Sequence, residues 1–309
     1  MQYRELGRTG LVVSVVGLGT SPLGETFGAV DEGDSLAIVR HALDSGITFF
    51  DSAPSYGKGL AERRLGEALK GHRDEVVVGT KAGRYGADDF DFSPGRVRDS
   101  LEQSLRLLGT DRVDLFQLHN IEFADLGGVI SDAYNEMVRL RDAGKCRFIG
   151  MTGYPIAALR RVIQEADLDV ALSYAHATLL DSCLQQSLLP LAHERGVGLI
   201  NAAAVSLGLL TPAGPKIKLP VTDELSAAAR RIVEECARLG ADVSFLANQY
   251  AIQRSGCATT LIGTVKPHHL ESAVAAATTP IDDQLLRQVL AAAGPATEWH
   301  WISGLPENN

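Results

Sequence analysis

Four side chains that can move or hold a proton lie at or just beyond the ends of short apolar runs: Asp51, Tyr56, Lys81 and His119. A phenol with an ordinary pKa of about 10 is a poor base at neutral pH, but a nearby ammonium favours its phenolate form. Asp51 can hold the Lys81 ammonium in place, and His119 can hydrogen-bond a reacting oxygen. Each residue alone also fits a plainer role, as a structural ion pair, a loop tyrosine or a core histidine. Together they predict a centre for proton transfer.

Eight short apolar runs are the elements that must position these side chains. They are mostly continuous in apolarity, which is typical of strands buried on both faces. The segments between them carry apolar residues at helical spacing, as at Val97, Leu101, Leu105 and Leu108. Strand and helix therefore alternate, and eight such units favour a closed (β/α)8 TIM barrel. We expect the strands at residues 15–19, 47–51, 76–81, 113–119, 147–152, 169–174, 197–203 and 259–263.

Other segments complete the expected barrel as one domain over residues 1–309. A Gly-Arg-Thr-Gly turn between residues 3–6 and 11–13 predicts an N-terminal β-hairpin, which could close the barrel floor. Two long loops expected at the C-terminal face, 83–94 and 208–222, have the length of lids or binding loops. Because chemistry in such barrels sits at the carboxyl ends of the strands, the four side chains should meet there.

The charge balance and the hydropathy of the chain exclude several classes of function. With 29 Lys and Arg against 38 Asp and Glu, the formal net charge is −9, which disfavours nucleic-acid binding. No apolar run approaches the about 18 residues of a membrane span, and the start of the chain has no apolar signal core. We therefore expect a cytoplasmic protein with no membrane partner. The cysteines and histidines show no metal-ligand spacing, which predicts reduced thiols and no built-in metal site.

Six motifs at the predicted strand ends are similar to those of one known family. They are GLGTSPLG (17–24), GITFFDSAPSYGKGLAERRLGEAL (46–69), TKAGRYG (80–86), DLFQLHN (114–120), GKCRFIGMTG (144–153) and LIGTVK (261–266). On these motifs the chain resembles the aldo-keto reductases along nearly its full length. The resemblance implies hydride transfer with a nicotinamide cofactor and a catalytic tetrad of Asp51, Tyr56, Lys81 and His119. Within the family, the chain is most similar to enzymes that oxidise a free aldose at C1, on the segments SPLGETFG, AGRYGADDFDFS, HNIEF and MTGYP.

The resemblance also implies which residues contact the cofactor. NADP-using relatives carry an arginine at the position of His269 and often a lysine at Gly263, so this chain favours NAD over NADP. Lys266 remains as a cation that keeps NADP possible. The aromatic residue that usually stacks on the nicotinamide is missing from residues 201–204, and Tyr174 could replace it. The implied cofactor contacts are Gly19, Thr20, Ser21, Asp51, Thr152, Ser173 or Tyr174, Leu207, Gly208, Gly263, Thr264, Lys266 and His269.

The implied substrate pocket has a polar rim. Many relatives have a tryptophan directly after the catalytic histidine, whereas this chain has Asn120 at that position. Polar groups beside aromatic platforms suit a sugar better than an aromatic aldehyde. The expected substrate contacts are Tyr56, His119, Asn120, Arg84, His176 and Trp301.

These expectations combine into one leading function and two alternatives. The leading function is NAD-dependent oxidation of a free aldose, of the L-galactose or L-fucose type, at C1 to its lactone, with Tyr56 as acid or base. One alternative is an NADPH-dependent reductase of small aldehydes, and the other is a non-catalytic barrel subunit that binds a nucleotide. The expected partner is a small-molecule sugar, and we expect the chain to be a monomer or a weak homo-oligomer.

Overall fold

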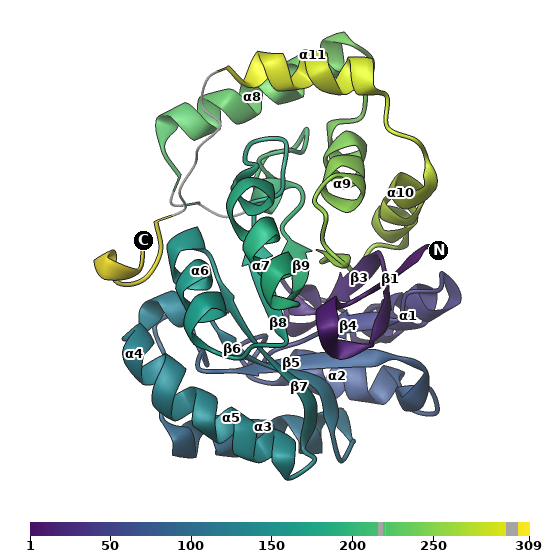
Figure 1. Ribbon diagram of the computed structural model, residues 1–309. Coiled ribbons are helices and arrows are strands. Elements are labelled where there is room, and N and C mark those ends of the chain that lie inside the picture. Colours follow the sequence, from purple (N-terminus) through teal and green to yellow (C-terminus); the bar gives the residue numbers. More distant parts are fainter. Residues whose placement is uncertain (216–218, 220, 295–301) are drawn as a thin grey trace.

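Eight parallel strands close into a barrel in the computed structural model, which describes residues 1–215, 219, 221–294 and 302–309. Around the barrel the strands follow the order β10-β3-β4-β5-β6-β7-β8-β9 (Figure 1). The TIM-barrel fold and the eight predicted strands are confirmed. The strands are β3 (Val16–Gly19), β4 (Phe49–Asp51), β5 (Val77–Ala82), β6 (Val113–His119), β7 (Cys146–Gly153), β8 (Val170–Tyr174), β9 (Gly198–Ala202) and β10 (Thr259–Ile262).

Helices connect successive strands and cover the outside of the barrel (Figure 1). In α3, Val97, Leu101 and Leu105 form part of a buried stripe at helical spacing, Pro94 occupies the first turn, and Gly109 ends the helix in a left-handed conformation. The helices are α1 (Glu32–Asp44), α2 (Leu60–Ala68), α3 (Pro94–Leu108), α4 (Leu126–Gly128), α5 (Tyr134–Asp142), α6 (Ile156–Glu165), α7 (Leu189–Arg195), α8 (Asp223–Arg238), α9 (Val243–Gln253), α10 (Pro267–Thr278) and α11 (Asp283–Ala293).

A two-stranded hairpin precedes the barrel and closes its floor, as the turn sequence predicts. β1 (Tyr3–Glu5) pairs antiparallel with β2 (Val12–Ser14). Leu6, Leu11 and Val13 are buried in one apolar cluster with inward-facing side chains of most barrel strands. The hairpin therefore keeps water out of one end of the barrel interior.

Two further apolar layers lie outside the barrel. One fills the space between the strands and the surrounding helices. The other joins α8, α9 and α11 through side chains that include Ile232, Leu246 and Val289. In Figure 1, α8 and α11 lie side by side at the edge of the molecule, beyond the helices that cover the strands. None of the described helices is long and apolar enough to cross a membrane.

The strand register brings the predicted catalytic side chains to one end of the barrel. Lys81 on β5 is the Cα partner of Gln117 on β6, and His119 on β6 is the partner of Thr152 on β7. Asp51 ends β4, the neighbour of β5. Because side chains alternate between the two faces of a strand, Gln117 and His119 lie on the same face of β6. The tetrad is therefore assembled from three adjacent strand ends and the loop after β4.

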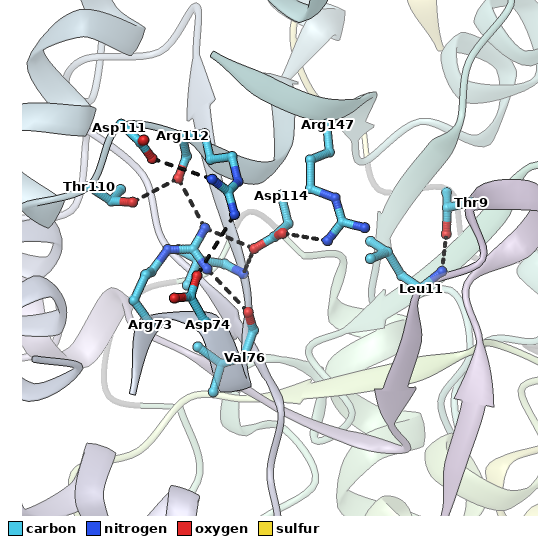
Figure 2. A network of polar contacts seen from close by, with 11 residues as sticks. Thr9, Leu11, Arg73, Asp74, Val76, Thr110, Asp111, Arg112, Asp114 and Arg147 are labelled. Atoms are coloured by element: carbon cyan, nitrogen blue, oxygen red, sulfur yellow. Dashed lines mark hydrogen bonds and ion pairs between the residues drawn. The ribbon is translucent and has the colours of Figure 1, made fainter. Parts of the chain in front are cut away.

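The opposite end of the barrel carries a separate group of charges, shown in Figure 2. Asp114, near the start of β6, accepts hydrogen bonds from Arg73 Nη2 (2.9 Å), Arg147 Nη1 (2.9 Å) and the backbone N–H of Val78 (3.0 Å). Arg73 also donates to the carbonyl oxygen of Arg112 (3.0 Å). These contacts tie the starts of β5, β6 and β7 together. We call Arg73, Asp114 and Arg147 the basal network.

Candidate active site

A buried ion pair lies at the centre of the candidate site. Lys81 Nζ donates to Asp51 Oδ2 (2.5 Å) and to the carbonyl oxygen of Ser52 (2.7 Å). Gln117 Nε2 donates to the other carboxylate oxygen of Asp51 (3.0 Å). Burial raises the pKa of Asp51, and the Lys81 ammonium and the Gln117 amide oppose that rise by stabilising the carboxylate. Gln117 is not among the site residues that the sequence predicts. Its position two residues before His119 on the same strand could have indicated it, because this spacing places both side chains on one face.

Tyr56 and His119 lie next to this ion pair and face each other. Their rings meet edge to face, with centroids 5.8 Å apart. Lys81 Nζ lies 5.2 Å from the centroid of the Tyr56 ring. Among the described residues, neither the Tyr56 hydroxyl nor a ring nitrogen of His119 has a hydrogen-bond partner, and His119 Nδ1 is buried. Both polar groups are therefore available to a ligand.

The protonation states of Tyr56 and His119 follow from their burial. Burial, with the added positive charges of Lys81 and Arg84, lowers the pKa of His119 well below its usual value, so its ring is neutral. Burial also raises the pKa of Tyr56, and the negative charge of Asp51 adds to that rise. The sequence led us to expect that Lys81 lowers the pKa of Tyr56. In the structure, the Lys81 charge is held against Asp51, and burial raises the pKa of Tyr56, so this expectation was wrong.

Comparison with known proteins decides the family of this chain. The Aldo/keto reductase family matches residues 15–293. The L-galactose dehydrogenase of Arabidopsis thaliana is 40% identical, over 100% of this chain and 99% of that protein. The D-threo-aldose 1-dehydrogenase of a Pseudomonas species is 32% identical, over 84% of this chain and 88% of its own length. The chain belongs to the aldo-keto reductase family.

A solved structure agrees with this assignment. An aldo-keto reductase from Bacillus halodurans, in its holo form, superposes with a TM-score of 0.79 at 25% identity, over 96% of this chain and 98% of that one. The protein is thus an oxidoreductase of a family whose members use nicotinamide cofactors.

In this aldo-keto reductase, the residues expected to hold the nicotinamide ring form a connected row. Thr152 Oγ1 accepts hydrogen bonds from the backbone N–H of Asn120 (3.2 Å) and from the Tyr174 hydroxyl (3.2 Å). The Tyr174 ring stacks on the Tyr154 ring, with centroids 4.8 Å apart. Tyr174 packs with the interior of the barrel, whereas Ser173, the preceding residue on β8, is buried on the other face. Of the two alternatives at this strand, only Tyr174 points toward the site.

The residues after β3 support the end of β4. Thr20 is fully buried, and its backbone N–H donates to the carbonyl oxygen of Asp51 (2.9 Å) while its hydroxyl donates to Ser52 Oγ (2.9 Å). Gly19 lies beside Gly263, since a Cβ added to Gly19 would stand 4.0 Å from Gly263 Cα. Ser21 is half-buried and begins a 3-10 turn. The structure therefore gives Thr20 a supporting role, and leaves Gly19 and Ser21 at the rim.

The expected dinucleotide contacts after β9 and β10 lie on two further segments. Lys266 is exposed at the N-terminus of α10, and its backbone N–H donates to Thr264 Oγ1 (3.0 Å). His269 Nδ1 lies 3.2 Å from the same hydroxyl oxygen. Leu207 and Gly208 lie in a turn after β9, with φ angles of 55° and 99°. Lys266, Thr264 and His269 thus gather at one helix N-terminus.

The expected substrate contacts separate into residues at the mouth and residues in the interior. Arg84 is half-buried, and its guanidinium donates to Asn120 Oδ1 (3.0 Å). Asn120 is 1% exposed, so the structure makes it a link within the protein and not an open sugar contact. His176 is also buried: Nδ1 lies 2.7 Å from Asp181 Oδ2, and Nε2 lies 2.6 Å from the Tyr154 carbonyl oxygen. It positions the backbone of Tyr154 instead of lining the mouth. Trp301 lies outside the described residues.

Proposed function

We propose that the protein oxidises a free aldose, of the L-galactose or L-fucose type, at C1 to its lactone with NAD. One observation carries the proposal: the Tyr56 hydroxyl and the His119 ring lie free and adjacent beside the buried Asp51–Lys81 pair. The names of two similar proteins, L-galactose dehydrogenase and D-threo-aldose 1-dehydrogenase, support a sugar as the substrate.

In the proposed reaction, this chain moves one proton and orients one oxygen. The hydroxyl on C1 gives its proton to the Tyr56 phenolate while the C–H electron pair leaves C1 and a C=O bond forms. The neutral His119 ring can donate one N–H to the C1 oxygen and fix its direction. A nicotinamide cofactor supplies the hydride acceptor when it is bound. Burial raises the pKa of Tyr56, so most of the protein carries the phenol near neutral pH. The phenolate fraction, and with it the rate of oxidation, should therefore rise as the pH rises.

The residues present fit a nicotinamide dinucleotide. Gly19 and Gly263 offer backbone without side chains at neighbouring strand ends, which allows a close approach. Lys266 places an exposed ammonium at the N-terminus of α10, where a helix favours an anion. Gly263 and His269 supply no permanent cation for a 2′-phosphate, and this favours NAD over NADP.

A panel of free aldoses, each assayed with NAD and with NADP by the absorbance of the reduced cofactor, tests the proposal. We expect turnover of L-galactose or L-fucose, with kcat/KM about 5- to 150-fold higher for NAD, because a poorly paired phosphate costs roughly 1–3 kcal/mol. His269→Arg should narrow or reverse this ratio by adding a planar donor pair. Equal efficiency with both cofactors would refute the cofactor assignment and leave the sugar assignment standing.

Two other results of the same panel would replace the proposed function. Reduction of small aldehydes with NADPH, without aldose oxidation, would make the protein a general carbonyl reductase. Cofactor binding without turnover of any aldose or aldehyde would make it a nucleotide-binding subunit. Sedimentation of the same preparation tests the expected state, a monomer or a weak homo-oligomer.

A further inference from the structure

Asn120 connects the catalytic histidine to a second group of polar side chains. It directly follows His119 and adopts a left-handed backbone conformation (φ 58°, ψ 58°), which asparagine tolerates better than most residues. Its backbone N–H donates to Thr152 Oγ1, and its carbonyl oxygen accepts from the backbone N–H of Phe123 (3.2 Å). Its side-chain amide is used on both sides, as acceptor and as donor. Any movement of Asn120 therefore moves the backbone that carries His119.

The acceptor side of the Asn120 amide holds the Arg84 guanidinium. Arg84 Nη1 donates to Asn120 Oδ1 (3.0 Å), and Arg84 Nε donates to the carbonyl oxygen of Gly86 (3.1 Å). The guanidinium carbon lies 5.7 Å from the centroid of the Phe90 ring, within the range of a cation–π contact. The contacts with Asn120, Gly86 and Phe90 thus fix the direction of the Arg84 guanidinium at the mouth of the site.

The donor side of the Asn120 amide is held by a buried carboxyl group. Asn120 Nδ2 donates to Glu122 Oε1 (3.0 Å), and Glu122 is fully buried. Ser303 Oγ donates to the same oxygen (3.1 Å), and the backbone N–H of Leu305 donates to the Glu122 carbonyl (2.8 Å). Glu122 is therefore fixed from both sides, and it fixes the orientation of the amide between itself and Arg84.

We propose that Asn120 and Glu122 are positioning residues that hold the Arg84 guanidinium at the mouth of the site, next to the strand end that carries His119, so that its charge acts on the proton-transfer group of Tyr56 and His119. The inference rests on the proposed sugar oxidation. It adds Arg84, as a second cation besides Lys81, to the residues that support proton transfer by Tyr56. The first cation, Lys81, is neutralised by Asp51 at 2.5 Å, so Arg84 supplies positive charge that no carboxylate cancels at contact distance among the described residues.

The electrostatics of the site agree with this geometry. The Arg84 charge opposes the rise in the pKa of Tyr56 that burial causes, and it adds to the lowering of the pKa of His119. It also opposes the rise in the pKa of Tyr154, whose ring stacks on Tyr174. The charged and titratable groups that act on the pKa of Tyr56 are Asp51, Tyr154 and Arg84, and the other such groups around it are Lys81, His119 and Tyr174.

Two substitutions at Arg84 separate its charge from its shape. Arg84→Gln keeps an amide donor for Asn120 and removes the charge, whereas Arg84→Lys keeps the charge and loses the planar fork. The measurement is kcat and KM for sugar oxidation from pH 6 to pH 10, with cofactor affinity followed by fluorescence. We expect Arg84→Gln to move the rising limb of the kcat profile upward by roughly one pH unit, and to lower kcat at neutral pH about tenfold. Arg84→Lys should restore most of the limb position.

A third substitution tests the positioning role. Asn120→Ala releases the guanidinium and should move the limb in the same direction by a smaller amount. The double variant Arg84→Gln with Asn120→Ala should then move the limb no further than Arg84→Gln alone, because both changes act through one charge. Additive shifts would show that Asn120 acts by another route.

Other outcomes would overturn the inference. A raised KM with an unmoved limb in Arg84→Gln would make Arg84 a sugar contact only. Equal losses in Arg84→Gln and Arg84→Lys would make it a structural residue. Should Arg84→Gln fail to fold, the limb in Asn120→Ala alone decides, and an unmoved limb rejects the proposal. An inactive Tyr56→Phe beside an unshifted Arg84→Gln rejects only this inference, whereas an active Tyr56→Phe rejects the proposed function itself.

Discussion

The two ends of the barrel each hold a buried carboxylate, and the two are used differently. At the floor, Asp114 accepts three hydrogen bonds, and its partners Arg73 and Arg147 keep 23% and 48% of their side-chain surface exposed. At the mouth, Asp51 is paired with Lys81, which is fully buried. The side chains of both arginines at the floor keep part of their surface in solvent, which lowers the cost of burying the Asp114 charge beside them.

The difference extends to the neighbouring polar groups. Next to the Asp51–Lys81 pair stand a phenol and an imidazole without partners among the described residues. Buried polar groups are normally satisfied, so the buried, unpaired Nδ1 of His119 next to the half-buried Tyr56 indicates a place for a ligand. The floor is built for stability and the mouth for chemistry, and substitutions at the two ends should have opposite signatures.

The largest effect is expected from Tyr56→Phe. The change removes the hydroxyl that accepts the proton, and kcat for sugar oxidation should fall by at least about 100-fold. Cofactor affinity, measured by fluorescence, should change little, because the ring remains. The wild-type rate should rise from neutral to alkaline pH, since the raised pKa of Tyr56 keeps the phenol protonated near neutrality.

Tyr134→Phe is the matched control for this change. The Tyr134 hydroxyl donates to the Asp167 carbonyl oxygen (3.2 Å) away from the tetrad, so its loss should leave kcat unchanged. Near-normal turnover in Tyr56→Phe would remove the acid–base role from this residue.

The next effect is expected at the floor, from Asp114→Asn. The new amide NH₂ would face a guanidinium donor, so we expect the free energy of unfolding to fall by about 1–3 kcal/mol in urea titrations. The kcat per folded molecule should stay at the wild-type value. Asp111→Asn is the control, because this carboxylate is 86% exposed and lies 3.7 Å from Arg112. Its loss should change stability by less than about 0.5 kcal/mol. Loss of kcat with unchanged stability in Asp114→Asn would contradict the division between the two ends.

The smallest effect is expected from Glu62→Gln on α2, behind the mouth. The Glu62 carboxyl accepts a hydrogen bond from Thr80 Oγ1 (2.6 Å), and burial raises its pKa. A raised pKa in the folded state means that this group stabilises the protein fully below its unfolded pKa, and that this contribution is lost as the pH rises toward the folded pKa. The Gln variant has no proton to lose.

The measurement is therefore the free energy of unfolding of wild type and of Glu62→Gln as a function of pH. Wild type and Glu62→Gln should have similar unfolding free energies near pH 4, and the variant should gain on wild type by about 1 kcal/mol toward neutral pH. Glu67→Gln, on the exposed side of the same helix, should show no such gain. A difference between Glu62→Gln and wild type that is independent of pH would show that folding does not shift the pKa of Glu62.

The sequence predicts the strands and the tetrad well because both depend on local patterns. β6 begins and ends at the predicted residues, Val113 and His119. β4 is two residues shorter at its start than expected, because the Ile47 backbone N–H donates back to the Ala42 carbonyl oxygen of α1 (3.0 Å) and the strand begins only at Phe49. Once the strands are known, the rule that chemistry lies at their carboxyl ends brings Asp51, Lys81 and His119 together.

What the sequence does not predict depends on contacts between distant segments. The sequence does not show that His176 finds Asp181 and the Tyr154 carbonyl, or that Asn120 is enclosed between Arg84 and Glu122. The expected direction of the Tyr56 pKa was wrong for the same reason. A motif places Lys81 near Tyr56, but the balance between burial and the Asp51 charge appears only when the packing is known.

The hairpin that closes the floor also constrains the order of events during synthesis. Arg8 donates its backbone N–H to the carbonyl oxygen of Gly196 (2.8 Å), and Leu6 packs against Gly198 at the start of β9. These partners leave the ribosome about two hundred residues after the hairpin itself. The ring of strands closes later still, when β10 pairs with β3. The hairpin is thus made well before its partners in β9, so its contacts with that strand can form only after most of the barrel has been synthesised.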